Sequence, residues 1–345
     1  MTSGTQRLVV IVGAGASADA ATPEYVNDDK WRPPLVKDLF SRKYSAVLDR
    51  YPFAQEVAAD LGPGQQPALS IEQFIRERYR GSDHPPSLRK YHSIPLYLQE
   101  LLHGCSQHFT PAPDNYLRLM SALLELPETV FVTLNYDTLL DSRLSGHSPL
   151  QTLDDYIARK EPEWSLIKLH GSVNWGRAIR GPSSFSFVEP PPELHLDEEI
   201  VVTGGAAEPI NVLRGIGTES YYPALSVPVG EEDELVCPPL HVEFLQERLA
   251  GADALHLLII GYSANDLEVL KLLKDSETEI ESVLIVNRSE EDCGYVEEQL
   301  GRHLGVHFGP IDRPYFPRGF GNFTAEATPA GLPGYLEGLR RKLRP

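Results

Sequence analysis

Five short apolar segments recur along the chain, and each ends abruptly in polar residues or glycine. Continuous runs of Val, Ile and Leu are typical of strands that are buried on both faces of a parallel sheet. A helical pattern at 265–274 lies between the last two runs. This alternation predicts an α/β fold with a Rossmann-like, doubly wound parallel sheet. The five predicted strands are 8–12, 130–134, 166–169, 255–260 and 283–286.

The remaining segments have other patterns. Helical spacing of apolar residues predicts a helical insertion over about 35–126, after a proline-containing surface loop at 22–34. Proline-rich sequence over about 176–240 predicts a smaller loop-rich module with one strand-like run, 200–203. The last segment is irregular until a basic amphipathic stretch, 335–343. We therefore expect a main domain over 1–300 and a C-terminal extension over 301–345.

Composition and charge narrow the class of protein. The chain of 345 residues is 41% hydrophobic and 23% charged, and no apolar run approaches the ~20 residues that span a bilayer. A strand follows the first seven residues without a secretory signal, which predicts a cytoplasmic protein. The formal net charge of −18 disfavours direct binding to nucleic acid, because that binding relies on Lys and Arg. It leaves room for a basic partner protein, which the acidic run 231–234 could contact, although a solvated loop is the simpler interpretation.

The three cysteines lie far apart in the sequence, at Cys105, Cys237 and Cys293. No C-x-x-C pair is present that would predict a structural zinc site or a redox couple. We expect reduced thiols and no bound metal.

The segment GAGASA at 13–18 matches the dinucleotide-binding pattern G-x-G-x-x-G/A. In that pattern Gly13 allows a tight turn and Gly15 allows close approach to a pyrophosphate, although a plain glycine turn between strand and helix is the alternative. Hydride-transferring enzymes of this fold also need an acidic residue after a second strand. The corresponding segment here, 31–40, is a proline-led helix start that contains Asp38. This disfavours a nicotinamide-dependent oxidoreductase.

Polar residues follow the other predicted strands. The candidates are Asn135 and Asp137, then His170 with Gly171, Gly261 with Tyr262 and Ser263, and Asn287. Ligands bind at the carboxyl ends of the strands in open α/β sheets. Each residue also has an ordinary structural explanation, since Asp137 or Ser263 could cap a helix and a lone histidine is commonly structural. Five consecutive strand ends of this kind favour a ligand site.

In their order and in the residues that they contain, these motifs resemble those of the sirtuin family. The matching segments are GAGAS at 13–17, T-x-N-x-D at 133–137, LHG at 169–171, GYS at 261–263 and VN at 286–287. Deacetylating sirtuins have glutamine where this chain has Leu134, and they have a four-cysteine zinc module that three scattered cysteines cannot supply. The sequence is more similar to the sirtuin-like branch with TxNYD, KLHGS and IGYSxxD, found in bacterial anti-phage defence proteins that hydrolyse NAD+.

The resemblance implies an NAD+ glycohydrolase with NAD+ as its substrate and without a metal. Asn135 and His170 would be the residues on which cleavage depends, and Asp137 would bind the nicotinamide carboxamide. The remaining NAD+-binding residues implied by the motifs are Gly13, Ala14, Gly15, Ala16, Ser17, Thr133, Gly171, Gly261, Tyr262, Ser263, Asp266 and Asn287.

Two other functions compete with hydrolysis. One is a non-catalytic regulatory module that binds NAD or ADP-ribose, and the other is an NAD-dependent protein deacylase, which the absence of a cysteine zinc module disfavours. Hydrolysis and cyclisation of the product are not separable by sequence. By analogy with the family, an effector that depletes NAD+ during abortive infection would be controlled through a homo-oligomer or an activating partner, such as a HerA-type ATPase or a phage protein.

Overall fold

The computed structural model describes residues 5–20, 31–61, 75, 84–108, 115–126, 128–157, 163–180, 190, 193–203, 220–226, 236–306, 314–327 and 330–343. Three features considered above lie largely or wholly outside these ranges: the loop 22–34 up to residue 30, the helical spacing over 71–78 except Ile75, and the acidic run 231–234. Within the described ranges, no helix combines the length and the apolar character needed to cross a membrane.

A six-stranded parallel sheet organises the main body of the molecule, with the strand order β3-β2-β1-β7-β8-β9. The first strand lies in the middle, where Val10 pairs with Phe131 on one side and with Leu258 on the other. The sheet therefore has its topological switch point between β1 and β7, which confirms the predicted α/β fold. Its strands are β1 (Gln6–Val12), β2 (Thr129–Thr133), β3 (Trp164–Lys168), β7 (Ala254–Ile260), β8 (Glu279–Val286) and β9 (Tyr315–Phe316).

The five predicted strands are all present, but each begins earlier than its apolar run. The largest difference is in β8, which begins at Glu279 although the apolar run begins at Val283. Residues 279–282 alternate between exposed and partly buried positions, because this end of the strand projects toward solvent. A strand end that is half solvated lacks the continuous apolar sequence by which its buried part is recognised.

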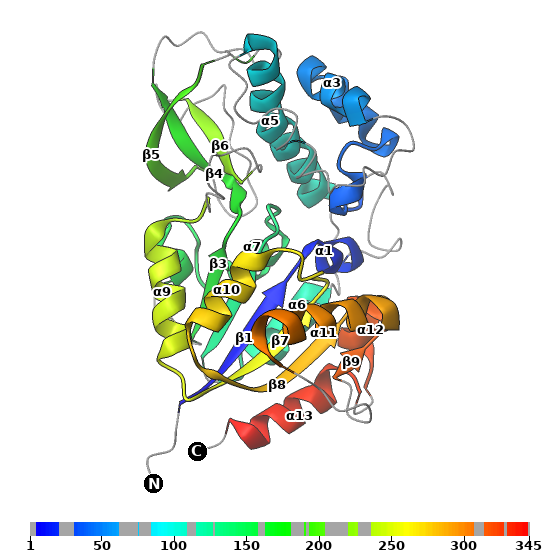
Figure 1. Cartoon of the computed structure of the whole chain (residues 1–345), viewed down its shortest axis with the longest axis vertical. Coiled ribbons are helices and arrows are strands. Elements are labelled where there is room, and N and C mark those ends of the chain that lie inside the picture. The colour runs from blue at the N-terminus through cyan, green and yellow to red at the C-terminus, as the bar shows by residue number, and fades with distance from the viewer. Residues whose placement is uncertain are drawn as a thin grey trace.

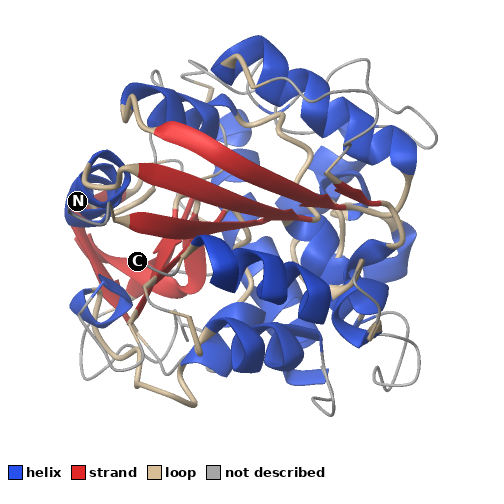
Figure 2. Ribbon diagram, turned by 90° about the horizontal axis from the view of Figure 1, so that it is seen from below, coloured by secondary structure: helices blue, strands red, loops and turns tan. Residues whose placement is uncertain are grey.

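Helices cover both faces of the sheet (Figure 2). Alternate residues of β1 separate the two cores: Val10 belongs to the cluster that contains α6, α7, α12 and α13, and Ile11 belongs to the cluster that contains α9, α10 and α11. The helices in chain order are α1 (Ala14–Ala20), η2 (Val36–Asp38), η3 (Arg42–Tyr44), α2 (Ser45–Leu48), α3 (Pro52–Leu61), α5 (Pro85–His108), α6 (Asn115–Leu123), α7 (Leu139–Leu144), α8 (Asp154–Ile157), α9 (Pro239–Ala250), α10 (Leu267–Asp275), α11 (Glu290–Leu304), α12 (Gly319–Ala325) and α13 (Leu332–Lys342).

A smaller module lies beyond the carboxyl ends of the main sheet (Figure 1). It contains an antiparallel sheet of order β5-β4-β6, formed by β4 (Gly171–Arg180), β5 (His195–Val202) and β6 (Tyr221–Leu225). Helix α5 packs against it, and Gln99 Nε2 donates to Val173 O at 2.9 Å. Among the residues that the structure describes here, the predicted run 200–203 lies at the end of β5, and β4 and β6 complete the same sheet. Pro223 is accommodated because β6 is an edge strand, where a missing N–H breaks no ladder.

The C-terminal segment completes the main sheet. The basic amphipathic stretch at 335–343 lies mostly within α13, but the expected irregular stretch before it is wrong, because it contains β9 and α12. Asp19 Oδ2 accepts the N–H of Gly321 at 2.9 Å, which ties α12 to the end of α1. The glycine-containing sequence of α12 has weak helix propensity, and burial of Phe320 and Phe323 holds it in place.

Candidate functional site at the carboxyl edge of the sheet

Residues 13–17, which form the turn after β1 and the start of α1, are called the glycine loop below. They pack directly against Gly261, which follows β7. Gly13 N donates to Ile260 O at 3.0 Å, and Gly15 N donates to Gly261 O at 2.9 Å. A Cβ atom would lie 2.6 Å from Gly261 O if placed on Gly13 and 2.8 Å from it if placed on Gly15. Contact between two loops thus requires both glycines, independently of any ligand.

These hydrogen bonds limit how the loop could hold a phosphate. Gly13, Gly15 and Ala16 already donate their N–H groups to carbonyl oxygens of the protein. Phosphate binding by this loop would therefore use the N–H of Ala14 or break one of these bonds. The predicted phosphate-binding segment thus consists of the turn at Gly13 and the first turn of α1, and the N–H groups of Gly13, Gly15 and Ala16 are engaged within the protein.

Asn135 connects the end of β2 to this glycine loop. Its Nδ2 donates to Gly13 O and to Ser17 Oγ, both at 3.0 Å, and its backbone N–H donates to Thr133 Oγ1 at 3.1 Å. The side chain is only 9% exposed. Because both amide hydrogens are donated to the protein, Oδ1 is the side-chain atom with which Asn135 could accept a hydrogen bond from a ligand.

A buried tyrosine extends this cluster. Tyr116 on α6 shares a hydrogen bond of 3.0 Å with Ser17 Oγ. Burial, and then the nearby charge of Asp137, raises the pKa of Tyr116 well above its usual value, so the phenol stays protonated. The sequence does not distinguish Tyr116 from the other apolar positions of α6, so it was not predicted.

Asp137 lies at the start of α7, where its Oδ1 accepts the N–H of Leu139 at 3.1 Å. Asp137 thus pairs with the first N–H of the helix, although the N-cap position itself is occupied by Thr138. The side chain is 7% exposed, and burial raises the pKa of this carboxyl, although Lys168 and a hydrogen bond from Ser17 oppose the shift. The protonated form of Asp137 is consequently favoured relative to an aspartate in water.

A fully buried ion pair lies behind Asp137. Lys168 Nζ donates to Asp141 Oδ2 at 2.9 Å and to Asp137 O at 2.6 Å, and both charged side chains have 0% exposure. Tyr156 OH donates to Asp141 Oδ1 at 3.0 Å, and Asn174 Nδ2 donates to Tyr156 OH at 3.2 Å. These partners satisfy two charges that would otherwise be costly to bury. Sequence reasoning missed this network because its members come from β3, α7, α8 and β4.

His170, just after β3, contacts Asp266, just before α10. Its Nε2 lies 2.6 Å from Asp266 Oδ2, and the two side chains are 18% and 19% exposed. Asp266 is also the N-cap of α10, since its Oδ1 accepts the N–H of Glu268 at 2.9 Å. Ser263 is therefore not the cap that the sequence suggested; it is exposed and accepts a hydrogen bond from Asn265. The ring of Tyr136 lies beside His170, with centroids 6.2 Å apart.

The electrostatic environment of Asp266 differs from that of Asp137. Burial alone would raise the pKa of Asp266, but the hydrogen bond and charge of His170 and the N–H groups of Glu268 and Val269 outweigh it, and the pKa is lowered. Asp266 is therefore a carboxylate at neutral pH.

One group of side chains in the described part of the chain could share a cation. The potential ligand atoms of His170, Asp266 and Glu268 lie within 4.8 Å of one another. The direct hydrogen bond between His170 and Asp266 already explains this arrangement. The absence of a metal from the function stays a prediction.

The other candidate residues lie at the same edge and mainly hold loops together. Asn287 Nδ2 donates to Tyr262 O at 3.2 Å, and Asn287 O accepts the N–H of Gly319 at 2.8 Å. Thr133 Oγ1 donates to Val12 O at 2.9 Å, and Gly171 has a φ of +80° that favours glycine. The fold thus brings the predicted residues to one edge, with Asn135, Ser17 and Asp137 in one cluster and His170 with Asp266 in a second.

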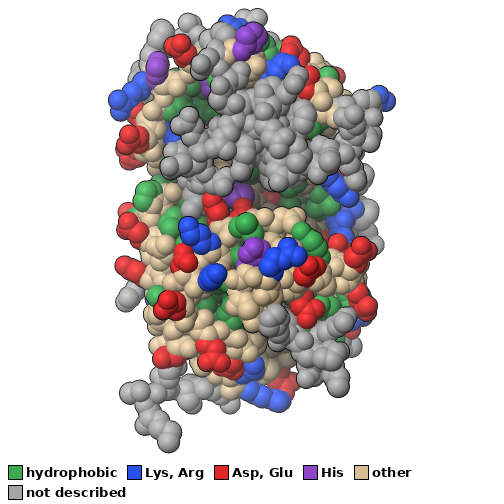
Figure 3. All heavy atoms as spheres, viewed as in Figure 1, with side chains coloured by type: hydrophobic (Ala, Val, Ile, Leu, Met, Phe, Trp, Pro, Cys, Tyr) green, Lys and Arg blue, Asp and Glu red, His purple; other side chains and the backbone are tan. Residues whose placement is uncertain are grey.

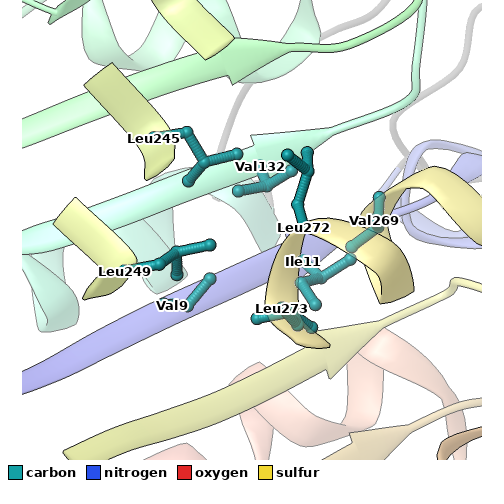
Figure 4. Close-up of a pocket in the computed structure, with 8 residues that line it drawn as sticks. All are labelled: Val9, Ile11, Val132, Leu245, Leu249, Val269, Leu272 and Leu273. Atoms are coloured by element: carbon teal, nitrogen blue, oxygen red, sulfur yellow. The ribbon is translucent and has the colours of Figure 1, made fainter. Parts of the chain in front are cut away.

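A small cavity elsewhere is unsuited to a nucleotide. It lies between α9, α10 and the sheet (Figure 4) and is lined by aliphatic side chains, including Val9, Leu245 and Leu272. Such a lining offers no hydrogen-bond donor to a phosphate. On the face seen in Figure 3, acidic and basic side chains are interspersed over the described surface and do not form one basic patch.

No protein-family model and no curated protein matches the chain. Several solved structures resemble it weakly. A Sir2 homologue mutant in complex with ADP-ribose has 13% sequence identity and a TM-score of 0.39, covering 98% of this chain and 94% of that one. A Sir2 homologue in complex with NAD has 15% identity and a TM-score of 0.38, covering 99% and 92%. Sir2 in complex with an inhibitor, 2'-O-acetyl-ADP-ribose and a deacetylated p53 peptide has 14% identity and a TM-score of 0.36, covering 92% and 91%.

Proposed function

We propose that this chain is an NAD+ hydrolase that cleaves the bond between nicotinamide and ribose, giving ADP-ribose and nicotinamide. The proposal rests on the hydrogen bond from Asn135 Nδ2 to Gly13 O in the glycine loop, at the switch point of the parallel sheet. Nucleotides bind at this point in this class of fold. The motif resemblance described for the sequence supports the same activity.

Cleavage of the bond between nicotinamide and ribose needs little general acid catalysis. The transition state resembles an oxocarbenium ion, and nicotinamide leaves as a neutral molecule. The site must hold the ribose, place a water molecule and stabilise developing positive charge. Asn135 Oδ1 would accept a hydrogen bond from a ribose hydroxyl, and His170 would accept a proton from a hydroxyl or from the attacking water.

Asp137 would bind the carboxamide of nicotinamide. As a carboxylate it can accept a hydrogen bond from the carboxamide nitrogen, and in the protonated form, toward which its raised pKa shifts it, it can also donate one to the carboxamide oxygen. The pyrophosphate would lie along 13–17, and the adenosine would extend toward Ser263 and Asn287. NAD+ is in this proposal a substrate, and no metal takes part.

Control of such an activity is part of the proposal. Uncontrolled hydrolysis would deplete the NAD+ of the cell that makes the protein, so we propose regulation by a homo-oligomer or by an activating partner in anti-phage defence. The net charge of −18 suits a basic partner.

The test is incubation of the purified protein with NAD+, followed by chromatography of the products. We expect ADP-ribose and nicotinamide, and a loss of about 10²-fold or more in turnover for His170→Ala and for Asn135→Ala. Matched controls are His256→Ala and Asn115→Ala, which remove buried hydrogen-bonding side chains outside the two clusters and should retain turnover. Intact NAD+ in a protein that binds it, alone and with its neighbouring gene products, contradicts the proposal.

A non-catalytic NAD- or ADP-ribose-binding module is the second candidate. It is favoured by one observation: the side-chain N–H groups of Asn135 and of Asn287 donate to carbonyl or hydroxyl oxygens of the protein, which is a structural use of both residues. Calorimetric binding of ADP-ribose without turnover of NAD+ would identify it. Release of acetyl-ADP-ribose from an acetylated peptide would instead indicate deacylation, and cyclic ADP-ribose would indicate cyclisation.

A further inference from the structure

We propose that Asp266 is a positioning residue that holds His170 as the Nε2–H tautomer, so that Nδ1 is the nitrogen that accepts the proton during NAD+ cleavage. This inference rests on the proposed hydrolase function and assigns Asp266 to the histidine, where the motif had suggested only nucleotide binding.

The first argument is the chemistry of the contact. The distance of 2.6 Å between His170 Nε2 and Asp266 Oδ2 is that of a strong hydrogen bond. An ionised carboxylate can only accept, so Nε2 must carry the proton of a neutral imidazole. A neutral imidazole has a single N–H, and Nδ1 therefore has the lone pair.

The second argument is the rigidity of Asp266. Its other oxygen accepts the N–H of Glu268 in the first turn of α10, and Tyr262 OH donates to Asp266 O at 2.6 Å. Helix α10 is itself fixed on the sheet by Val269 and Leu270, which are 3% and 1% exposed. The two carboxylate oxygens thus have separate partners, so the helix start determines the orientation of the imidazole.

The third argument is the position of the pair in the sheet. His170 follows β3 and Asp266 follows β7, whereas β2 and β1 lie between these two strands. The pair therefore spans the ends of the strands that carry Asn135 and Gly13. A base held there is beside the place proposed for the ribose.

Every bond and proton in this hydrolysis step can be accounted for. As the water oxygen bonds to the anomeric carbon, the bond to nicotinamide breaks and its electron pair stays on the nicotinamide nitrogen. Nδ1 takes the proton of the water, and the imidazolium that forms is stabilised by the carboxylate of Asp266. Release of that proton to solvent restores the starting tautomer.

The test compares the wild-type protein with Asp266→Asn by kinetics and by ¹⁵N NMR of the imidazole nitrogens. Asparagine caps helices as well as aspartate does, but its NH₂ group can donate to Nε2 and so favours the Nδ1–H tautomer. We expect the NMR signals of His170 to show Nε2–H in the wild type and Nδ1–H in the variant. We expect kcat to fall about 10²-fold or more with little change in KM, since the same substitution in Ser-His-Asp hydrolases acts through the tautomer.

Ser289→Ala is the matched control, because Ser289 caps α11 by accepting the N–H of Asp292 and follows β8, whereas His170 and Asp266 follow β3 and β7. It should lower stability as a lost cap does and leave kcat unchanged. Unchanged kcat in Asp266→Asn, or an Nδ1–H tautomer in the wild type, overturns the inference while an active wild type keeps the hydrolase function. If the wild type itself leaves NAD+ intact, the proposed function fails and this inference fails with it.

Discussion

At the scale of single residues, two aspartates at the edge of the sheet have opposite effects on folding. The pKa of Asp137 is raised by burial, whereas the hydrogen bond and charge of His170 help to lower the pKa of Asp266 against the effect of its own burial. Asp137 therefore favours the folded state below its unfolded pKa of about 3.9, and this contribution is lost as the pH rises through its folded pKa. Asp266 favours the folded state above its unfolded pKa, and its contribution is lost as the pH falls through the folded pKa.

Replacement of Asp137 by Asn should raise the melting temperature at about pH 7, because the amide carries no charge to bury and still accepts the N–H of Leu139. The gain should shrink as the pH falls, because the raised pKa of Asp137 favours the protonated, uncharged carboxyl in the folded wild type. Thermal melts at a series of pH values measure it. Asp266→Asn serves as the opposite control: it should lower the melting temperature near neutrality. A melting temperature for Asp137→Asn below that of the wild type at neutral pH would contradict the prediction.

Disruption of the buried ion pair between Lys168 and Asp141 should change the free energy of unfolding more than replacement of Asp137 does. Lys168→Met leaves a carboxylate with 0% exposure without its cation, and it should lower the free energy of unfolding by about 3–5 kcal/mol. Addition of Asp141→Leu should recover much of that loss. Urea unfolding of both single variants and the double variant measures the coupling. Arg302→Met, which breaks an exposed pair with Glu298, is the control and should change stability by less than about 0.5 kcal/mol.

The residues that the sequence predicted are those that follow an apolar run. Asn135 and His170 were found in this way, because a polar residue after a buried strand is conspicuous in the sequence. Tyr116, Lys168 and Asp141 were not, since their proximity depends on how α6, β3 and α7 pack. Asp266 was named from its motif, but its pairing with His170 was not predicted, because the two residues lie 96 positions apart in the chain.

At the scale of elements, the segments that follow β1 and β7 are in close backbone contact. Gly261 has a φ of +60°, and a Cβ atom there would lie 2.0 Å from Ala16 N. Gly305 has a similar φ of +69° but has no heavy atom within 4 Å of such a Cβ atom. Comparison of Gly261 with Gly305 therefore separates two contributions to the loss of stability on substitution: the left-handed backbone conformation, which both share, and the steric clash, which only Gly261 has.

Gly261→Ala should therefore destabilise the protein much more than Gly305→Ala. We expect about 1–2 kcal/mol for Gly305→Ala, from the left-handed conformation alone, and at least about 2 kcal/mol more for Gly261→Ala. Nucleotide affinity should also fall in Gly261→Ala, because the glycine loop must move away. Chemical denaturation and ligand titration measure both effects. Equal destabilisation by the two substitutions would mean that the loops separate without cost.

The elements that the sequence did not predict share a physical cause. The strands of the parallel sheet were predictable because burial on both faces demands continuous apolar residues. Strand β5 was predicted only at its end, as the run 200–203, because its earlier residues are exposed or partly buried. Strand β6 contains Pro223 and has no continuous apolar run that would predict a strand. Helix α12 contains two glycines, and its packing on α1 and α6 stabilises it more than its propensity does.

At the scale of the whole molecule, the two ends of the chain share one core. Leu332, Leu336 and Leu339 of α13 belong to the same buried cluster as Leu8 and Val10 of β1. Each buried leucine contributes about 1.5–3 kcal/mol, so α13 accounts for a substantial part of a total stability of about 5–15 kcal/mol. The division at residue 300 expected from the sequence stays a prediction, but the packing of α13 bears directly on it.

Deletion of residues 330–345 should accordingly abolish cooperative unfolding or lower the melting temperature strongly. Circular dichroism during heating measures this. The control is Arg340→Ala combined with Lys342→Ala, which changes exposed charges of α13 and should leave the melting temperature nearly unchanged. A truncated chain that melts like the full-length protein would show that the C-terminal segment is a dispensable extension.

The packing around the buried ion pair has an optical consequence. Trp175 lies at 0% exposure with its ring edge-on to Tyr156, at a centroid distance of 5.2 Å, and Tyr156 donates to Asp141. His241 lies beside the same indole, and burial lowers its pKa, so it stays a neutral neighbour near pH 7. A ligand that shifts Asp137 would disturb this group through Lys168. In a variant in which Trp31 and Trp164 are replaced by Phe, the emission of Trp175 should therefore report events at the strand ends without an added label, and it can be followed by stopped-flow fluorescence.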